Sequence, residues 1–118
     1  MVSPQVYCDI EEVLMWFGGK DYSNSMPKVY RFTIYPLLLD YIMNMLSAAA
    51  DAYELKEGRV ENINKILSNL AKVRTVSRLL RKHEILSLRQ HDYLDRVYVK
   101  IETGAKKWRS ASKKDIPE

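Results

Sequence analysis

The chain has 118 residues, of which 47% are hydrophobic and 29% are charged, with four glycines and four prolines. This composition excludes a disordered chain and predicts a single globular domain with a packed core. One cysteine excludes an internal disulfide, and neither a secretory leader nor an uninterrupted apolar span of ~20 residues is evident, so we expect a cytoplasmic protein without a transmembrane helix.

The net charge of +4 is divided unevenly along the chain. Residues 1–58 contain four Lys/Arg and eight Asp/Glu, whereas residues 59–118 contain fifteen Lys/Arg and seven Asp/Glu. The second half is therefore a candidate surface for polyanions such as nucleic acid. The alternative is that basic helices pack beside acidic ones, so that the charges are neutralised within the fold.

The first half of the sequence predicts two helices. Apolar residues recur at helical spacing over residues 6–17, and Gly18-Gly19 ends this helix. After a polar loop and a proline-marked entrance, a second, Leu- and Met-rich helix is predicted from residue 28 to about residue 55. Pro36 removes one backbone hydrogen bond and crowds the preceding turn, so we expect a kink or break near residues 32–35.

The second half predicts two more helices. Apolar residues repeat every three or four positions over residues 60–80, and Ser87 and Gln90 have the spacing of a capping box. The last helix is therefore expected to begin at about Leu88 and to run toward Trp108. Short connections between four such helices predict an all-α, up-and-down antiparallel four-helix bundle as a single domain over residues 1–118, with residues 110–118 as a frayed tail.

No grouping of residues in the sequence is typical of catalysis. His83 and His91 are the only histidines, and neither forms a metal-ligand spacing with Cys8. No serine or cysteine has the context of a nucleophile, and no glycine-rich phosphate loop is present. Carboxylates such as Asp92 and Asp95 lie near arginines in sequence, as in ordinary helix ion pairs. We therefore expect no enzyme, no metal site and no cofactor.

Three arginines in the predicted helix over residues 60–80 share one side. Arg74, Arg78 and Arg81 fall within about 60° of arc and border the apolar face. Their guanidinium groups suit either carboxylates of a neighbouring helix or subunit, or phosphates. We assign an organising role in the bundle or its interface to Arg74 and Arg78, and a partner-binding role to Arg81 and Lys82.

The end of the last predicted helix is strongly basic around Trp108. Such a cluster suits phosphate contacts with stacking on a base. The alternative, which we favour for Trp108 itself, is that this ring is the last core anchor. The predicted nucleic-acid-binding residues are Lys65, Lys72, Arg81, Lys82, Lys106, Lys107 and Arg109; the predicted interface or bundle-organising residues are Arg74, Arg78 and Trp108.

Several short motifs, in their order and spacing, resemble a known family. The motifs are Met26-Pro27-Lys28 followed by Arg31-Phe32, Val73-Arg74 with Arg78, Leu86-Ser87, and the terminal Trp108. Over residues 9–110 the chain resembles the accessory variability determinant proteins of diversity-generating retroelements, which belong with the small bacterial four-helix-bundle proteins. It departs from the family pattern at Glu102 and Lys106-Lys107, where small residues are usual, so contacts that need close backbone approach are not expected there.

The resemblance implies a homopentamer with a basic surface. Its partners would be the reverse transcriptase of the element and its template RNA or DNA, and it would support mutagenic retrohoming without catalysing it. One alternative is a bundle of the same superfamily encoded in a ribosomal RNA intervening sequence. Another is a protein-protein scaffolding bundle whose basic face meets an acidic protein.

Overall fold

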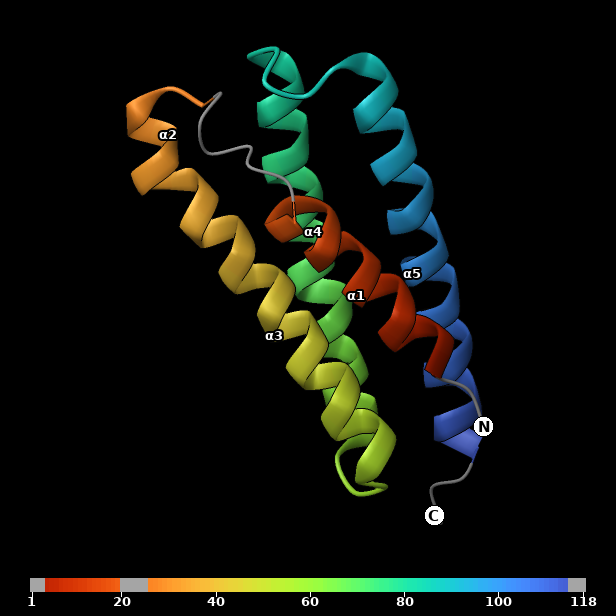
Figure 1. The fold of residues 1–118 in the computed structure, drawn as a ribbon. Coiled ribbons are helices and arrows are strands. Elements are labelled where there is room, and N and C mark those ends of the chain that lie inside the picture. Colours follow the sequence, from red (N-terminus) through yellow and green to blue (C-terminus); the bar gives the residue numbers. More distant parts are fainter. Residues whose placement is uncertain (1–3, 20–25, 115–118) are drawn as a thin grey trace.

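The computed structural model describes residues 4–19 and 26–114. Within these ranges the chain is helical and contains no strand (Figure 1). The helices are α1 (Pro4–Gly19), α2 (Lys28–Phe32), α3 (Ile34–Glu54), α4 (Arg59–Lys82) and α5 (Leu88–Lys114). Because α2 and α3 are two parts of one bent helix, the bundle has four long helical units, and the predicted all-α class is confirmed.

The four units form a closed ring of neighbours. Helix α3 packs against α4, α4 against α5, and α1 against both α3 and α5. In Figure 1, α3 and α5 run downward, α4 runs upward, and the shorter α1 crosses in front at an angle. The described molecule is elongated, with extents of 51 × 24 × 20 Å, so the core is a column along the bundle axis.

Each long helix contributes one buried apolar row to this column. In α1 the buried apolar residues are Val6, Ile10, Val13 and Phe17, which lie on the face expected from the sequence. The other helices add Leu38, Ile42, Met45, Ile63, Ile66, Leu70, Val73, Leu80, Leu94, Tyr98, Ile101 and Trp108. The apolar periodicity of residues 6–17 and 60–80 therefore predicted the inward faces of α1 and α4 correctly.

The break between α2 and α3 lies where Pro36 predicts it. Thr33 separates the two segments, with φ −121° and ψ −63°. Its Oγ1 donates a hydrogen bond of 2.5 Å to the carbonyl oxygen of Val29. Since Pro36 has no N–H for the carbonyl of Phe32, the helix cannot continue its hydrogen-bond ladder through this turn. The expected break near residues 32–35 is confirmed.

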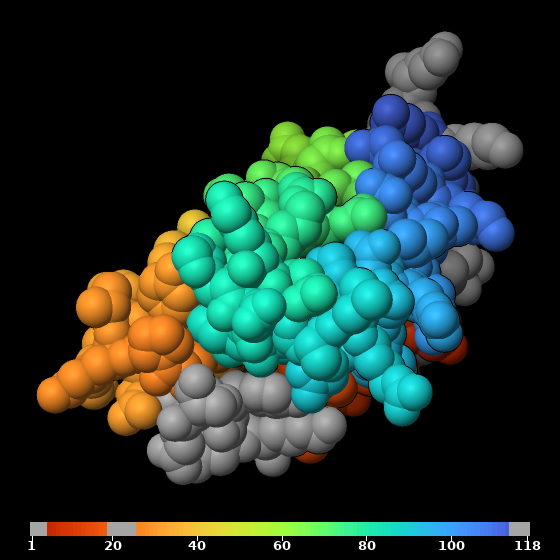
Figure 2. All heavy atoms as spheres, turned by 90° about the horizontal axis from the view of Figure 1, so that it is seen from above, coloured from red at the N-terminus to blue at the C-terminus, as the bar shows by residue number. Residues whose placement is uncertain are grey.

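The turn between α4 and α5 is closed by the predicted capping box. The Ser87 amide donates to Gln90 Oε1 at 2.9 Å, and the Gln90 amide donates to Ser87 Oγ at 3.1 Å. Two otherwise unpaired amides at the start of α5 are thereby satisfied. Figure 2 shows this end of the bundle from above. The end of α4 and the start of α5 lie together in the middle, and α2 lies at the left, in orange.

The far end of α5 differs from the prediction. The helix continues to Lys114, beyond residue 110, from which a frayed tail was expected; residues 115–118 lie outside the described residues. Ser112 is buried, and its hydroxyl donates to the Trp108 carbonyl at 2.8 Å. This polar residue extends the buried row of α5 by another turn because it satisfies its hydroxyl within the helix.

Helices α1 and α5 approach each other closely at Gly104. A Cβ atom at this position would lie 2.9 Å from Val6 Cγ2, which is too near for an ordinary contact. The departures at Glu102 and Lys106-Lys107 led us to expect no close approach at this end of α5. That expectation is wrong, because α1 approaches α5 at Gly104, which lies between those positions.

The bent helix α2–α3 carries more apolar surface than the core uses. Over Lys28–Glu54 it is long and apolar enough to cross a bilayer by length and composition alone, and only 28% of its most apolar window is buried. The same helix supplies Leu38, Ile42 and Met45 to the core, as expected of a helix in a globular bundle. Much of its remaining apolar surface therefore lies outside the core.

Candidate nucleic-acid interface

Charge is separated between the helices of the bundle. Helices α1 and α3 contain six Asp/Glu and no Lys/Arg, whereas α4 and α5 contain fifteen Lys/Arg and four Asp/Glu. Because α4 and α5 are direct neighbours, their cations gather on one side of the molecule. The uneven charge of the two halves of the sequence thus becomes a spatial separation, with a basic side formed by α4 and α5.

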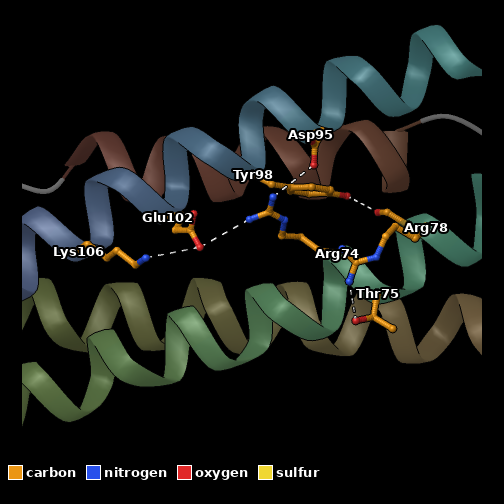
Figure 3. A network of polar contacts seen from close by, with 8 residues as sticks. Arg74, Thr75, Arg78, Asp95, Tyr98, Glu102 and Lys106 are labelled. Carbon is orange, nitrogen blue, oxygen red and sulfur yellow. Dashed lines mark hydrogen bonds and ion pairs between the residues drawn. The ribbon is translucent and has the colours of Figure 1, made fainter.

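Arg74 joins the two basic helices to each other (Figure 3). One of its guanidinium nitrogens lies 3.5 Å from Asp95 Oδ1 and another 3.7 Å from Glu102 Oε2. Lys106 Nζ lies 3.8 Å from the same Glu102 oxygen. These partly exposed pairs each contribute at most about 1 kcal/mol, and the two pairs of Arg74 join α4 to α5. Arg74 therefore has the inter-helix contacts of a bundle-organising residue.

The other two arginines of the predicted stripe have different surroundings. Arg78 is exposed, and its guanidinium lies 3.4 Å from Thr75 Oγ1 of its own helix. Arg81 is partly buried and donates to the Leu86 carbonyl at 3.4 Å, which bridges the α4–α5 turn. Arg78 thus makes no bond to another helix among the described residues, and Arg81 is engaged in the turn rather than held toward solvent.

Trp108 belongs to the core. Its side chain is only 2% exposed, and its Nε1 is buried without an acceptor in the part of the chain that the structure describes. A ring in this position presents no face to a nucleic-acid base, so the core-anchor alternative describes Trp108. Burial of this indole N–H without an acceptor among the described residues lowers the free energy of unfolding at this end of the core.

The seven predicted phosphate-binding residues do not form one cluster. Lys72 Nζ lies 5.5 Å from the centre of the Tyr41 ring, on the side of α4 that faces α3. Arg109 of α5 donates to Asn64 Oδ1 of α4 at 2.9 Å. Lys65, Lys82 and Lys107 are exposed. The predicted set is therefore spread around the basic side, and several of its members bind other residues of the chain.

Four cations that were mostly outside the predicted set lie in a line on the outer face of α5. Arg89, Arg96, Lys100 and Lys107 are all exposed and are spaced by seven, four and seven residues. This spacing places them within about 40° of arc in a row about 27 Å long. We call these four residues the α5 row. Only Lys107 belonged to the predicted set, although the i, i+7, i+11, i+18 spacing is visible in the sequence.

Most of the α5 row is unpaired. Lys100 Nζ lies 3.9 Å from Oδ1 of the buried Asp9 in α1. Arg89, Arg96 and Lys107 make no hydrogen bond or ion pair with any residue in the described ranges. The nearby carboxylate of Asp95 is directed to Arg74 instead. Three cations in one line are therefore available to external anions, and phosphates are the anions that such spacing suits.

Two tyrosines have raised pKa values for structural reasons. Burial raises the pKa of Tyr98 far above its usual range, although its 2.6 Å hydrogen bond with Ser77 lowers the pKa in part. A hydrogen bond to Glu12 raises the pKa of the Tyr93 phenol. Both groups remain protonated at neutral pH. Over residues 4–19 and 26–114, no three His, Cys, Asp or Glu side chains are grouped to hold a metal ion.

The sequence matches no protein-family model, and neither a curated protein nor a solved structure matches the chain. The class of protein is therefore described only by the architecture and the charge distribution of the described residues. That class is an all-α helical bundle with one basic and one acidic side. The relation to accessory variability determinant proteins stays a resemblance of short motifs.

Proposed function

We propose that this protein is a non-enzymatic accessory subunit that binds nucleic acid through the basic side formed by α4 and α5. The observation that supports this proposal is the α5 row, in which Arg89, Arg96 and Lys107 have no partner among the described residues. Cations in a line bind a polyanion by displacing its counterions, without reading the bases. Because Trp108 is buried, base stacking by this ring is no part of the proposal.

The biological setting of this binding is proposed from the motif resemblance. We infer that the nucleic acid is the template RNA or DNA of a diversity-generating retroelement, that the protein partner is its reverse transcriptase, and that both meet in the cytoplasm. The genomic neighbourhood tests this setting directly. A reverse transcriptase gene beside a pair of near-identical repeats supports it, whereas a position inside a ribosomal RNA gene supports the intervening-sequence alternative.

Charge reversal tests the nucleic-acid contact. The triple variant Arg89→Glu, Arg96→Glu, Lys107→Glu is expected to bind labelled single-stranded RNA roughly 100-fold more weakly than the wild type. Each lost phosphate contact should also reduce the slope of log affinity against log salt by about 0.7, so the slope should fall by about 2. Fluorescence anisotropy at several salt concentrations measures both quantities.

A matched control uses the same change in net charge on α4. The triple variant Lys65→Glu, Lys72→Glu, Lys82→Glu removes three exposed cations from another part of the basic side. A larger loss in the α5 triple assigns the contact to the α5 row, and equal losses in the two triples indicate diffuse attraction to the whole basic side. Unchanged affinity in the α5 triple, or wild-type binding that is independent of salt, contradicts the proposal.

The resemblance also leads us to propose a homopentamer. Light scattering coupled to size exclusion should then give a mass about five times the 13.8 kDa of one chain. Mixed with the neighbouring reverse transcriptase and its template RNA, the protein should elute in one peak that separates at high salt. A monomer or dimer contradicts the pentamer, and separate elution of the three components contradicts the partnership.

A further inference from the structure

An exposed aromatic residue, Tyr93, lies beside the α5 row. It is 40% exposed, follows Arg89 by four residues and precedes Arg96 by three. By helical geometry its position is about 40° from the line of the row, so it lies on the same side of α5. The two arginines are about 10 Å apart along the helix axis, with Tyr93 between them. A strand held by both cations therefore passes beside this ring.

The ring of Tyr93 is not used by the fold. Helix α5 contains three aromatic residues, of which Tyr98 and Trp108 are buried and only Tyr93 is exposed. Over residues 4–19 and 26–114, no other aromatic ring contacts the Tyr93 ring and no Lys or Arg lies over it. The ring is therefore open to an aromatic ligand from outside, which the buried Trp108 is not.

The hydroxyl of Tyr93 is held by the neighbouring helix. It donates a hydrogen bond to Oε1 of Glu12 in α1. The side chain is thereby fixed at both ends, at its backbone on α5 and at its hydroxyl on α1. A ring held in one orientation loses little conformational freedom when a ligand stacks on it, so this tether preorganises the ring for binding.

Three carboxylates surround Tyr93. Glu12 holds its hydroxyl, the exposed Glu11 is next to Glu12 in α1, and the exposed Asp92 precedes Tyr93 in α5. All three repel phosphate, whereas the cations of the α5 row attract it. The phosphates of a bound strand are therefore expected along the α5 row. The part of a nucleotide that can approach the ring is its uncharged base.

We propose that Tyr93 stacks on a base of a single-stranded nucleic acid whose phosphates lie on the α5 row. This inference rests on the proposed phosphate contact and specifies its ligand. The bases of a duplex are paired and stacked within it, so they cannot reach a side chain on the surface of a helix. Stacking tolerates any sequence because every base has a π-face. The row and the ring together distinguish single strands from duplexes without reading a sequence.

Two substitutions of Tyr93 separate the role of the ring from that of the hydroxyl. Tyr93→Leu removes both, and it should bind labelled single-stranded RNA roughly tenfold more weakly than the wild type, with the same slope of log affinity against log salt. Its affinity for duplex RNA of the same length should stay within about twofold of the wild type. Tyr93→Phe keeps the ring and should retain single-strand affinity to within about threefold. Fluorescence anisotropy measures these affinities, and circular dichroism shows whether the variants are folded.

The matched control is Tyr53→Leu, which makes the same change at a tyrosine of α3 that is 48% exposed and lies outside the α5 row. It should bind both RNAs as the wild type does. Unchanged single-strand affinity in Tyr93→Leu overturns the proposal, and so does an equal loss for single-stranded and duplex RNA. A Tyr93→Phe variant that binds as weakly as Tyr93→Leu assigns the effect to the hydroxyl and also overturns it.

The α5 triple variant shows whether the stacking or the phosphate contact has failed. If the α5 triple loses affinity and Tyr93→Leu does not, the phosphate contact stands and only the stacking is overturned. If neither variant loses affinity, the proposed nucleic-acid contact is contradicted as well.

Discussion

Replacement of Trp108 by alanine is expected to lower the free energy of unfolding by about 3–5 kcal/mol. Trp108 is the largest fully enclosed side chain of α5 and is only 2% exposed. Its removal leaves a cavity at the end of the core column, where Ala105 and Ser112 of the same helix are too small to fill it. Urea denaturation monitored by circular dichroism measures the change, because this signal does not depend on the fluorescence of the tryptophan that is replaced.

Trp108→Phe separates packing from any role in binding. Phenylalanine keeps an aromatic ring in the core and removes the indole N–H that lacks an acceptor in the described chain, so the expected loss of stability is below about 2 kcal/mol. RNA affinity should be unchanged in this variant at temperatures where it is fully folded. A loss under about 1 kcal/mol in Trp108→Ala, or a large loss of RNA affinity in Trp108→Phe, would contradict the assignment of this ring to the core.

Local features of the sequence predicted much of the fold because their causes lie within a few residues. Pro36 breaks the hydrogen-bond ladder of its own helix, so the division into α2 and α3 follows from one residue. Ser87 and Gln90 satisfy each other's amides three positions apart, and the start of α5 follows equally directly. The inward faces of α1 and α4 followed from apolar periodicity in the same way.

The candidate site was predicted less well because charged residues take their partners from other helices. Asp95 was expected to pair with arginines nearby in sequence, but it faces Arg74 of α4. Arg109 bonds to Asn64, which is 45 positions away. These tertiary contacts decide which cations are free to bind an external anion. Some residues of the predicted set, such as Arg109, bind other residues of the chain, whereas Arg89 and Arg96 remain free within the described residues. The spacing of the α5 row was visible in sequence, but its lack of partners was not.

Helix α3 illustrates a different limit of sequence analysis. Helix α3 has two heptad rows of similar composition, one through Leu38, Ile42 and Met45 and the other through Leu39, Met43 and Leu46. Periodicity alone cannot decide which of the two faces the core, because both satisfy the same rule. The positions of α1 and α4 decide it, and they leave the second row at the surface.

Stability should fall at alkaline pH because of the buried phenol of Tyr98. Burial raises the pKa of Tyr98 in the folded chain well above the value of 10.0 that applies in the unfolded chain. The contribution of the buried, protonated Tyr98 phenol to the free energy of unfolding is therefore fully present below about pH 10. It is lost as the pH rises from there toward the raised pKa of this phenol. Over that interval the unfolded chain releases a proton that the folded chain retains, which lowers the free energy of unfolding by up to ~1.4 kcal/mol per pH unit.

Urea denaturation at pH 9, 10 and 11 measures this slope, and a double variant isolates its cause. Tyr98→Phe with Ser77→Ala removes both partners of the buried hydrogen bond, so neither is left unsatisfied. Lysines also titrate in this range, but they are common to both proteins and cancel in the comparison. Above pH 10 the wild type should lose stability more steeply than the double variant. Equal slopes would mean that the phenol reaches water when it ionises. This part of the α4–α5 interface would then open more readily than the burial of Tyr98 indicates.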